Sequence, residues 1–284
     1  NLPLQHPVNI AYEAATADLN DINMIDPFHL EAYGKTTVNY NRDVEIYPVV
    51  QATFEKIFGK STYQRPTDMG VNMAGFCITD EQACVDASHR EIIRRYFNTL
   101  CAVRQGLAEP SETSKIELLM NKTGLQDTDR PAVVSSRDRA EETNAPAVAI
   151  ELRDGRVISG KTTALLGASA AVLLNALKVL AGIQHDILLI SPIVIEPIQD
   201  LKIKHMGNRN PRLHTDEILI ALSICAATNP VAARAIKQLE KLKGCDAHAT
   251  TILSHVDENV FMKLGVSITS EPEYHTKKLY HPQK

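Results

Sequence analysis

The chain has 284 residues, 44% of them hydrophobic and 23% charged, with a net charge of -4 and a pI near 6.2. Such a composition is typical of a folded globular protein, and the length suits two domains or one large domain with additions. The acidic balance argues against a broad nucleic-acid-binding surface. The five cysteines form no C-x-x-C pair and no apolar run reaches the about 18 residues of a membrane span, so we expect a cytoplasmic protein without zinc and without membrane or nucleic-acid partners.

The N-terminal half of the sequence predicts helices. Residues 1–65 alternate short helical patterns with polar connectors, and residues 66–144 predict a helical domain that follows a break rich in Pro and Gly. Its helices are expected at 79–106, at 111–124 from Ser111, and at 130–144 with Pro131 in the first turn. Because the first residue is Asn1 and helical pattern follows at once, we expect the sequence to be a piece of a longer protein.

Residues 145–284 predict a different architecture. Alternating apolar and polar residues around Asp154-Gly155 indicate a hairpin. After it we expect an apolar helix over 165–182, a buried strand over 186–191, helices that start at Pro192, after a Thr215 cap and at Pro230, a strand over 247–253, a helix capped by Ser254, and a strand over 266–272. Strands separated by helices favour an α/β layered domain. The predicted fold is therefore a helical half followed by a C-terminal α/β domain, α+β overall.

The expected order of hairpin, helix, strand, helix and strand is similar to the zinc deaminase fold. That fold's chemistry requires H-x-E or C-x-E followed by P-C-x-x-C, and neither pattern occurs in this sequence. A cytidine-deaminase-like domain that has lost its metal is the corresponding expectation.

The stretch Gly155 to Thr162 matches the phosphate-loop pattern G-x-x-x-x-G-K-[ST]. Two β-branched residues inside it, Val157 and Ile158, favour extended backbone rather than a cradle for phosphate. The hairpin turn also explains Gly155 without a ligand. We therefore predict that the match arises by chance and that Lys161→Ala leaves nucleotide affinity unchanged.

Two predicted helix starts carry side chains that suit an anion. Lys161, Thr162 and Thr163 precede the apolar helix, and His214, Thr215 and Asp216 open a later one. Free N–H groups at helix starts attract anions. We expect these two helix starts to lie close together and to form one polar pocket for a phosphate-bearing small molecule. The alternative is that both are ordinary capped helix starts.

The segment from Asp18 to Glu45 is unusually rich in Asp and Asn. Oxygen ligands of this kind suit magnesium or a polyhydroxylated substrate, although Asp and Asn also form turns and caps. The candidate catalytic residues here are Asp21, Asp26 and His29, and the candidate substrate-binding residues are Asn41 and Arg42.

Several stretches, among them "TDMGVNMAGFCI", "NPRLHTDEILIALSICAATNP" and "LSHVDENVFMKLGV", resemble the bacterial domain-of-unknown-function family 1846. The resemblance extends over nearly the whole chain. It implies that full members are longer and carry a Gly-rich P-G-S-G-K-type loop shortly upstream of Asn1. Residues 1–65 would then be the remainder of an upstream nucleotide-binding domain.

Two functional hypotheses follow. In the first, the chain is part of a nucleotide-dependent phosphotransferase or ATPase that acts on a small molecule, with magnesium and ATP held through the upstream region. Asp21 or Asp26 would be a base or a magnesium ligand, Arg42 would hold an anionic group, and His29 and Asn41 would orient the substrate. In the second, the chain is a non-catalytic module that binds an anion or builds a homo-oligomer.

Overall fold

The computed structural model describes residues 52–53, 55–59 and 81–275, and it divides the chain into two compact units, residues 1–129 and 130–284. In the first unit, helix α5 (Glu81–Gln105) packs against α6 (Pro110–Thr123), and the turn η3 (Asp127–Asp129) follows. Both helices confirm the prediction, but α6 begins at Pro110 with Glu109 as its N-cap, one residue before the expected start. The expected boundary near residue 65 falls outside the described residues, so the three-domain division stays a prediction.

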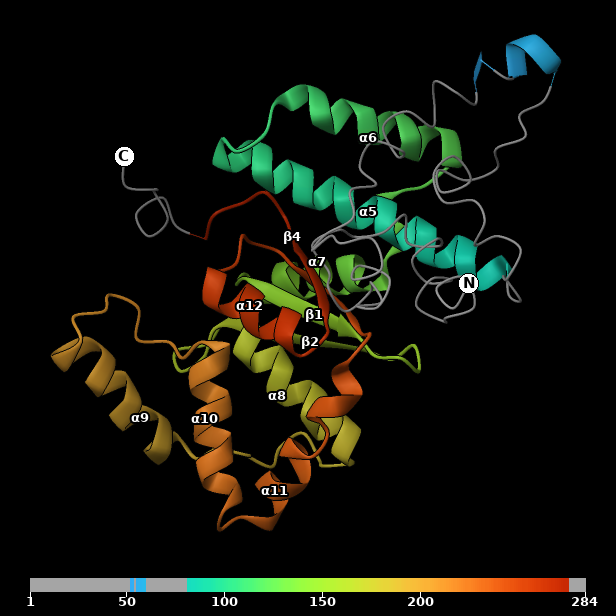
Figure 1. Cartoon of the computed structure of the whole chain (residues 1–284). Helices are drawn as coiled ribbons and strands as arrows, with labels where there is room; N and C mark the ends of the chain where they lie inside the picture. Colours follow the sequence, from blue (N-terminus) through green and yellow to red (C-terminus); the bar gives the residue numbers. More distant parts are fainter. Residues whose placement is uncertain (1–51, 54, 60–80, 276–284) are drawn as a thin grey trace, which may run out of the picture. The chain divides into compact units, whose positions relative to one another are not determined.

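The second unit is a four-stranded mixed sheet with helices on both faces (Figure 1). Its elements are, in chain order, α7 (Pro131–Thr143), β1 (Ala147–Glu151), β2 (Val157–Lys161), α8 (Ala168–Ala181), α9 (Pro192–Asp200), the π-helix η4 (Leu201–His205), α10 (Thr215–Ala226), α11 (Pro230–Ile236), η5 (Leu239–Leu242), β3 (Asp246–Ala249), α12 (His255–Lys263) and β4 (Ser267–Ser270). The strand order is β2-β1-β3-β4, with β1 antiparallel to both neighbours and β3 parallel to β4.

Alternate residues of the central strands enter two different environments, as strand geometry requires. Val148 and Ile150 of β1 join an aliphatic core with Leu173 and Leu177 of α8 and Phe261 of α12. Full burial of such a side chain stabilises the fold by about 1.5–3 kcal/mol. The opposite face of the sheet is covered by α7 and is polar.

A buried ionic network joins α7 to this polar face. Arg130, the fully buried N-cap of α7, donates from Nε and Nη2 to the two carboxylate oxygens of Asp246, both at 2.8 Å. Its Nη1 donates to Thr269 Oγ1 at 2.7 Å, and the same hydroxyl lies 2.8 Å from Nδ1 of the buried His248. Burial lowers the pKa of His248, although its contact with Glu271 favours the charged form. Thr269 therefore links the Arg130–Asp246 pair to the imidazole.

The hairpin prediction is confirmed, since β1 and β2 pair over Ala147–Glu151 and Val157–Lys161. The strand expected over residues 186–191 is wrong: these residues form turns and bends, with Leu188 61% exposed. A short apolar run does not distinguish a buried strand from a loop that buries only some of its side chains, and here Leu189 and Ile190 alone enter the core. The result is a mixed α/β unit, in which the deaminase-like arrangement is not confirmed.

Candidate functional site

The candidate site is a small pocket in the second unit where three helices begin. Its volume is about 70 Å³, more than the about 10–15 Å³ that one water requires. It is lined by the start of α8 (Gly167, Ala168, Ser169), the segment before α10 (Asn210, Arg212, Leu213, His214), the segment before α12 (Thr251, Ile252, Leu253, Ser254), and Pro146, Val148, Thr162, Asp257 and His275. The strands β2 and β3 end nearby, as in other α/β layered proteins whose ligands bind beyond strand ends.

A histidine that is hydrogen-bonded to a carboxylate lines the pocket. His214 Nδ1 lies 3.0 Å from Asp257 Oδ2, although 43 residues separate them. Because a carboxylate only accepts, we assign the proton to Nδ1. Ser254 donates to the same Oδ2 at 2.7 Å, and the N–H and hydroxyl of Thr215 both donate to Oδ1 at 3.0 Å. The Nε2 atom of His214 has no hydrogen-bond partner in the part of the chain that the structure describes.

The contact changes the acidity of both groups. The hydrogen bond to Asp257 raises the pKa of His214, and this effect exceeds the opposing effects of burial and of the Lys202 charge. Burial alone would raise the pKa of Asp257, but the hydrogen bonds from His214, Ser254 and the Thr215 backbone outweigh burial and lower it. His214 therefore gains a proton more readily than a free histidine, and Asp257 stays ionised.

A buried lysine holds the backbone segment that carries His214 in place through hydrogen bonds. Lys202, 3% exposed and located in the π-helix η4, donates to Glu217 Oε2 and to the carbonyl of Arg212, each at 2.7 Å. The same Oε2 atom accepts the backbone N–H of His214 at 2.9 Å. A π-turn often marks a functional position in a helix, and here it brings a cation beneath the segment that lines the pocket.

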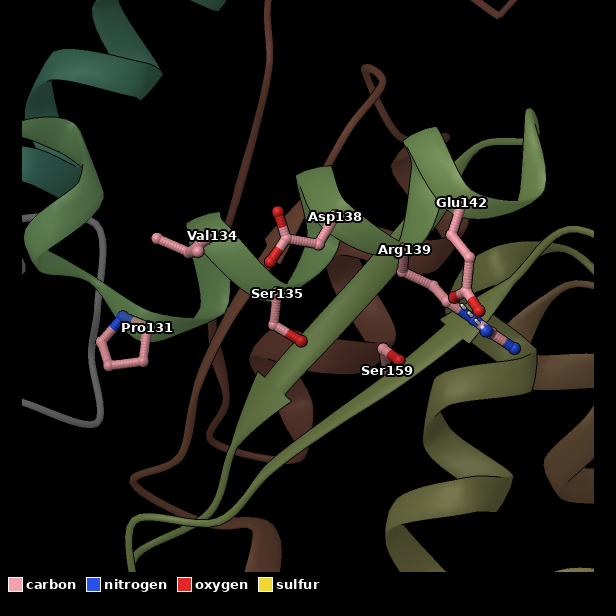
Figure 2. A pocket seen from close by; sticks show the side chains of 7 residues that line it. All are labelled: Pro131, Val134, Ser135, Asp138, Arg139, Glu142 and Ser159. Carbon is pink, nitrogen blue, oxygen red and sulfur yellow. Dashed lines mark hydrogen bonds and ion pairs between the residues drawn. The ribbon is translucent and has the colours of Figure 1, made fainter.

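A second, larger groove of about 630 Å³ lies beside α7 and the edge strand β2 (Figure 2). Figure 2 shows Arg139 and Glu142 paired with each other at one end of the groove and Pro131 at the other. Its charged side chains are solvent-accessible and of mixed sign, and none is held in a geometry like that of His214 and Asp257. We therefore assign the candidate site to the smaller pocket.

Comparisons with known proteins identify the family. The model described as "Domain of unknown function DUF1846, N-terminal" matches residues 1–124, and "Domain of unknown function DUF1846, C-terminal" matches residues 128–280. The chain belongs to the DUF1846 family. A UPF0371 protein of Streptococcus thermophilus is 58% identical over 280 residues, and one of Corynebacterium aurimucosum is 55% identical over 284 residues. These matches cover 99% and 100% of this chain but only 57% of each relative, so the chain spans little more than half the length of those relatives.

The family resemblance expected from the sequence is thus confirmed for both DUF1846 domains. Their boundary, between residues 124 and 128, nearly coincides with the division of the structure after Asp129. No helix among the described residues of this DUF1846 chain is long and apolar enough to span a membrane. The same residues contain no group of three or more His, Cys, Asp and Glu side chains arranged to hold a metal ion.

The structure brings together one member of each predicted helix start. Thr162 and His214 line the same pocket, as expected, whereas Lys161 and Asp216 are not among its lining residues. Lys161 is the last residue of β2, and the exposed Asp216 accepts the backbone N–H of Glu217 at 2.8 Å. Thr215 lies beside the pocket through its contacts with Asp257.

Two helix starts differ from the prediction. Helix α8 begins at Ala168 rather than at Leu165, with Gly167 as its N-cap, because residues 164–165 form a bend and Leu166 pairs with Leu213 in a parallel bridge. The N-cap of α10 is His214 rather than Thr215, which is the first helical residue. The candidates Asp21, Asp26, His29, Asn41 and Arg42 lie outside the described residues.

The phosphate-loop match has a structural explanation. Gly155 adopts φ +82° in the hairpin turn, a conformation that favours glycine. Gly160 lies so close to α8 that a Cβ atom would come 2.3 Å from Val172 N. The two fixed glycines of the pattern therefore serve a turn and a strand–helix contact, in agreement with the predicted hairpin.

The pocket residues that sequence reasoning missed as site residues include Ser169, Arg212, Ser254 and Asp257. Ser254 and Asp257 stand at the spacing of a helix cap and its third residue, which explains them locally. Only the tertiary contact with His214 shows their second role. For Ser169, the one signal in the sequence was its position in the first turn of a helix whose N-cap, Gly167, has no side chain.

Proposed function

We propose that residues 130–284 bind the anionic group of a small phosphate-bearing molecule in the pocket around His214, and that His214 exchanges a proton with the bound molecule. One observation carries the proposal: Asp257 holds Nδ1 of His214, while Nε2 lacks a partner among the described residues, in a cavity that also contains Arg212. An imidazole oriented by a carboxylate is a recurring arrangement for general acid–base chemistry. A guanidinium beside it favours an anionic substrate.

The size of the pocket supports a small ligand group. Pockets that enclose a drug-sized ligand have volumes of about 300–1,000 Å³, whereas this one has about 70 Å³. It therefore accommodates the charged end of a molecule, with the remainder outside. A whole nucleotide does not fit within this volume.

In the longer relatives, this pocket would serve as the acceptor-side or substrate-side site of a nucleotide-dependent phosphotransferase or ATPase. Magnesium and ATP would be held elsewhere, through the upstream region and Asp21, Asp26, His29, Asn41 and Arg42. His214 would then take a proton from the attacking hydroxyl or return one to the leaving oxygen. The alternative is a non-catalytic anion-binding or homo-oligomerising module with a metal-free, deaminase-like fold, in which His214 contributes only positive charge.

Binding and turnover separate these possibilities. We expect inorganic phosphate to raise the melting temperature of the chain, and His214→Gln to weaken this effect while the fold persists. Gln retains a hydrogen-bonding group but no titratable proton. Phosphate binding to the wild-type chain should therefore become tighter as the pH falls through the His214 pKa, and binding to the variant should not.

The catalytic hypothesis needs the full-length protein. Nucleotide hydrolysis that is lost on His214→Gln but retained in a matched His255→Gln variant, altered at the first residue of α12, would support acid–base catalysis. Equal loss in both variants, or phosphate binding that is indifferent to pH and to His214, would refute the proposed role.

A further inference from the structure

The N-terminus of α8 is unlike those of the other two helices at the pocket. Its N-cap, Gly167, has no side chain, and the backbone N–H groups of Ala168, Ser169 and Ala170 donate to no residue that the structure describes. By contrast, Asp257 accepts the Thr215 N–H of α10, and Ser254 accepts the Asp257 N–H of α12. A helix of 14 residues thus presents its unpaired donors and positive dipole end to the cavity.

Ser169 provides a second, independent observation. It is only 3% exposed, it lines the pocket, and its hydroxyl has no hydrogen-bond partner within residues 81–275. The hydroxyl oxygen is not one of the fully enclosed side-chain atoms that lack a partner among the described residues, so it keeps a small accessible surface. Because Ser169 lines the pocket, this unpaired hydroxyl is available to a ligand there.

Arg212 completes the set of donors. Its Nε donates to the carbonyl of Thr163 at 2.8 Å, and its own carbonyl is held by Lys202 at 2.7 Å. Its Nη1 and Nη2 atoms make no hydrogen bond or ion pair to any described residue. The arginine is thus anchored next to the pocket while both terminal nitrogens remain able to donate.

The number of donors distinguishes between anions. The pocket offers three backbone N–H groups, one hydroxyl and two guanidinium nitrogens as donors. These are more donors, from more directions, than the two oxygens of a carboxylate are able to accept with good geometry. A phosphate monoester presents three acceptor oxygens and close to two negative charges. A helix N-terminus with adjacent hydroxyl and arginine side chains is a favourable environment for such a group.

We propose that the first turn of α8, Ser169 and Arg212 form a cradle for the terminal phosphate of a phosphate monoester. This inference rests on the proposed function, since it assigns the substrate class and the binding residues of the same pocket. The rest of the ligand lies outside the small cavity, and His214 remains accessible to an oxygen next to the phosphate.

Calorimetric titration of the chain with inorganic phosphate, sulfate and acetate tests this assignment. We expect phosphate to bind more tightly than acetate, and Ser169→Ala to weaken phosphate binding by about tenfold, the effect of one hydrogen bond to a charged group. Ser223→Ala, an exposed change on α10, is the matched control and should bind as the wild type does.

A second variant keeps the test independent of folding. Gly167 has φ -68° and ψ 159°, and a Cβ atom there would come no closer than 3.6 Å to another group, the carbonyl of Leu213. Gly167→Asp should therefore fold, and its carboxylate should cap α8 in place of the ligand. We expect a higher melting temperature and loss of phosphate binding.

The outcomes separate this inference from the proposed function. Phosphate binding that depends on His214 but is unchanged in both Ser169→Ala and Gly167→Asp would overturn the cradle and leave the acid–base pocket intact. Acetate binding as tight as phosphate would also overturn it. Absence of any anion binding to the wild-type chain would refute both.

Discussion

Replacement of Arg130 by Met should destabilise the second unit severely. The guanidinium is fully buried and makes four hydrogen bonds, two to Asp246 and one each to Thr269 Oγ1 and the Ala247 carbonyl. Methionine fills much of the same volume but leaves the Asp246 carboxylate, 4% exposed, without this counter-charge. Removing one partner of a buried ion pair costs about 3–5 kcal/mol. Against a total stability of about 5–15 kcal/mol, this predicts a fall in melting temperature of roughly 6–20 °C.

Urea and thermal denaturation followed by circular dichroism measure the effect. The double variant Arg130→Met, Asp246→Leu should recover most of the loss, because replacing both partners with apolar residues is often neutral or stabilising. Arg156→Met, which breaks an ion pair exposed in the hairpin turn, should leave the midpoint unchanged. A loss below about 1 kcal/mol for Arg130→Met, the range of a surface pair, would refute the reasoning.

Three further predictions concern the same unit. The raised pKa of His214 means that its contribution to stability is complete below about pH 6.5 and is lost as the pH rises through its folded pKa; His214→Gln should therefore lower the melting temperature more in mild acid than in alkali, and an equal shift at both would contradict this. Gly160→Ala should cost at least about 1–3 kcal/mol, since its Cβ would strike the backbone of Val172, and urea midpoints should show it to be worse than Gly155→Ala, whose Cβ meets nothing within 4 Å and whose cost is limited to about 1–2 kcal/mol of strain at φ +82°. Elemental analysis of the purified chain should find no stoichiometric zinc, and one zinc per chain would show that the absence of zinc-ligand spacing was misjudged.

The sequence predicted the locally determined parts of the fold. Asp154-Gly155 requires a tight turn, and alternation on either side defines the paired strands, so the hairpin of β1 and β2 followed from neighbouring residues alone. Ser254 also acts as the N-cap of α12, as its position indicated. In each case the deciding interactions span only a few residues.

The remaining features depend on contacts that a local pattern does not contain. Thr162 and Thr163 have the composition of a helix cap, yet the chain runs on to Gly167 because Leu166 pairs with Leu213. His214 was recognised as a candidate, but its partner Asp257 lies 43 residues further along the chain. The pocket was predictable as a meeting of helix starts, whereas the pairing of His214 with Asp257 was not.

The buried Arg130–Asp246 pair imposes an order of events during synthesis. Arg130 precedes Asp246 by 116 residues, and at about 5–20 residues per second the ribosome needs roughly 6–23 s to make the intervening chain. During that time the guanidinium has no buried counter-charge and must remain in water, so α7 is unable to close over its face of the sheet. The hairpin and α8 form from consecutive sequence, but the polar side of the domain is able to pack only after β3 and β4 have been synthesised. In a nascent chain stalled before Asp246, the α7 side should therefore stay accessible. Chaperones should bind it and proteases should cleave it before they reach the apolar side.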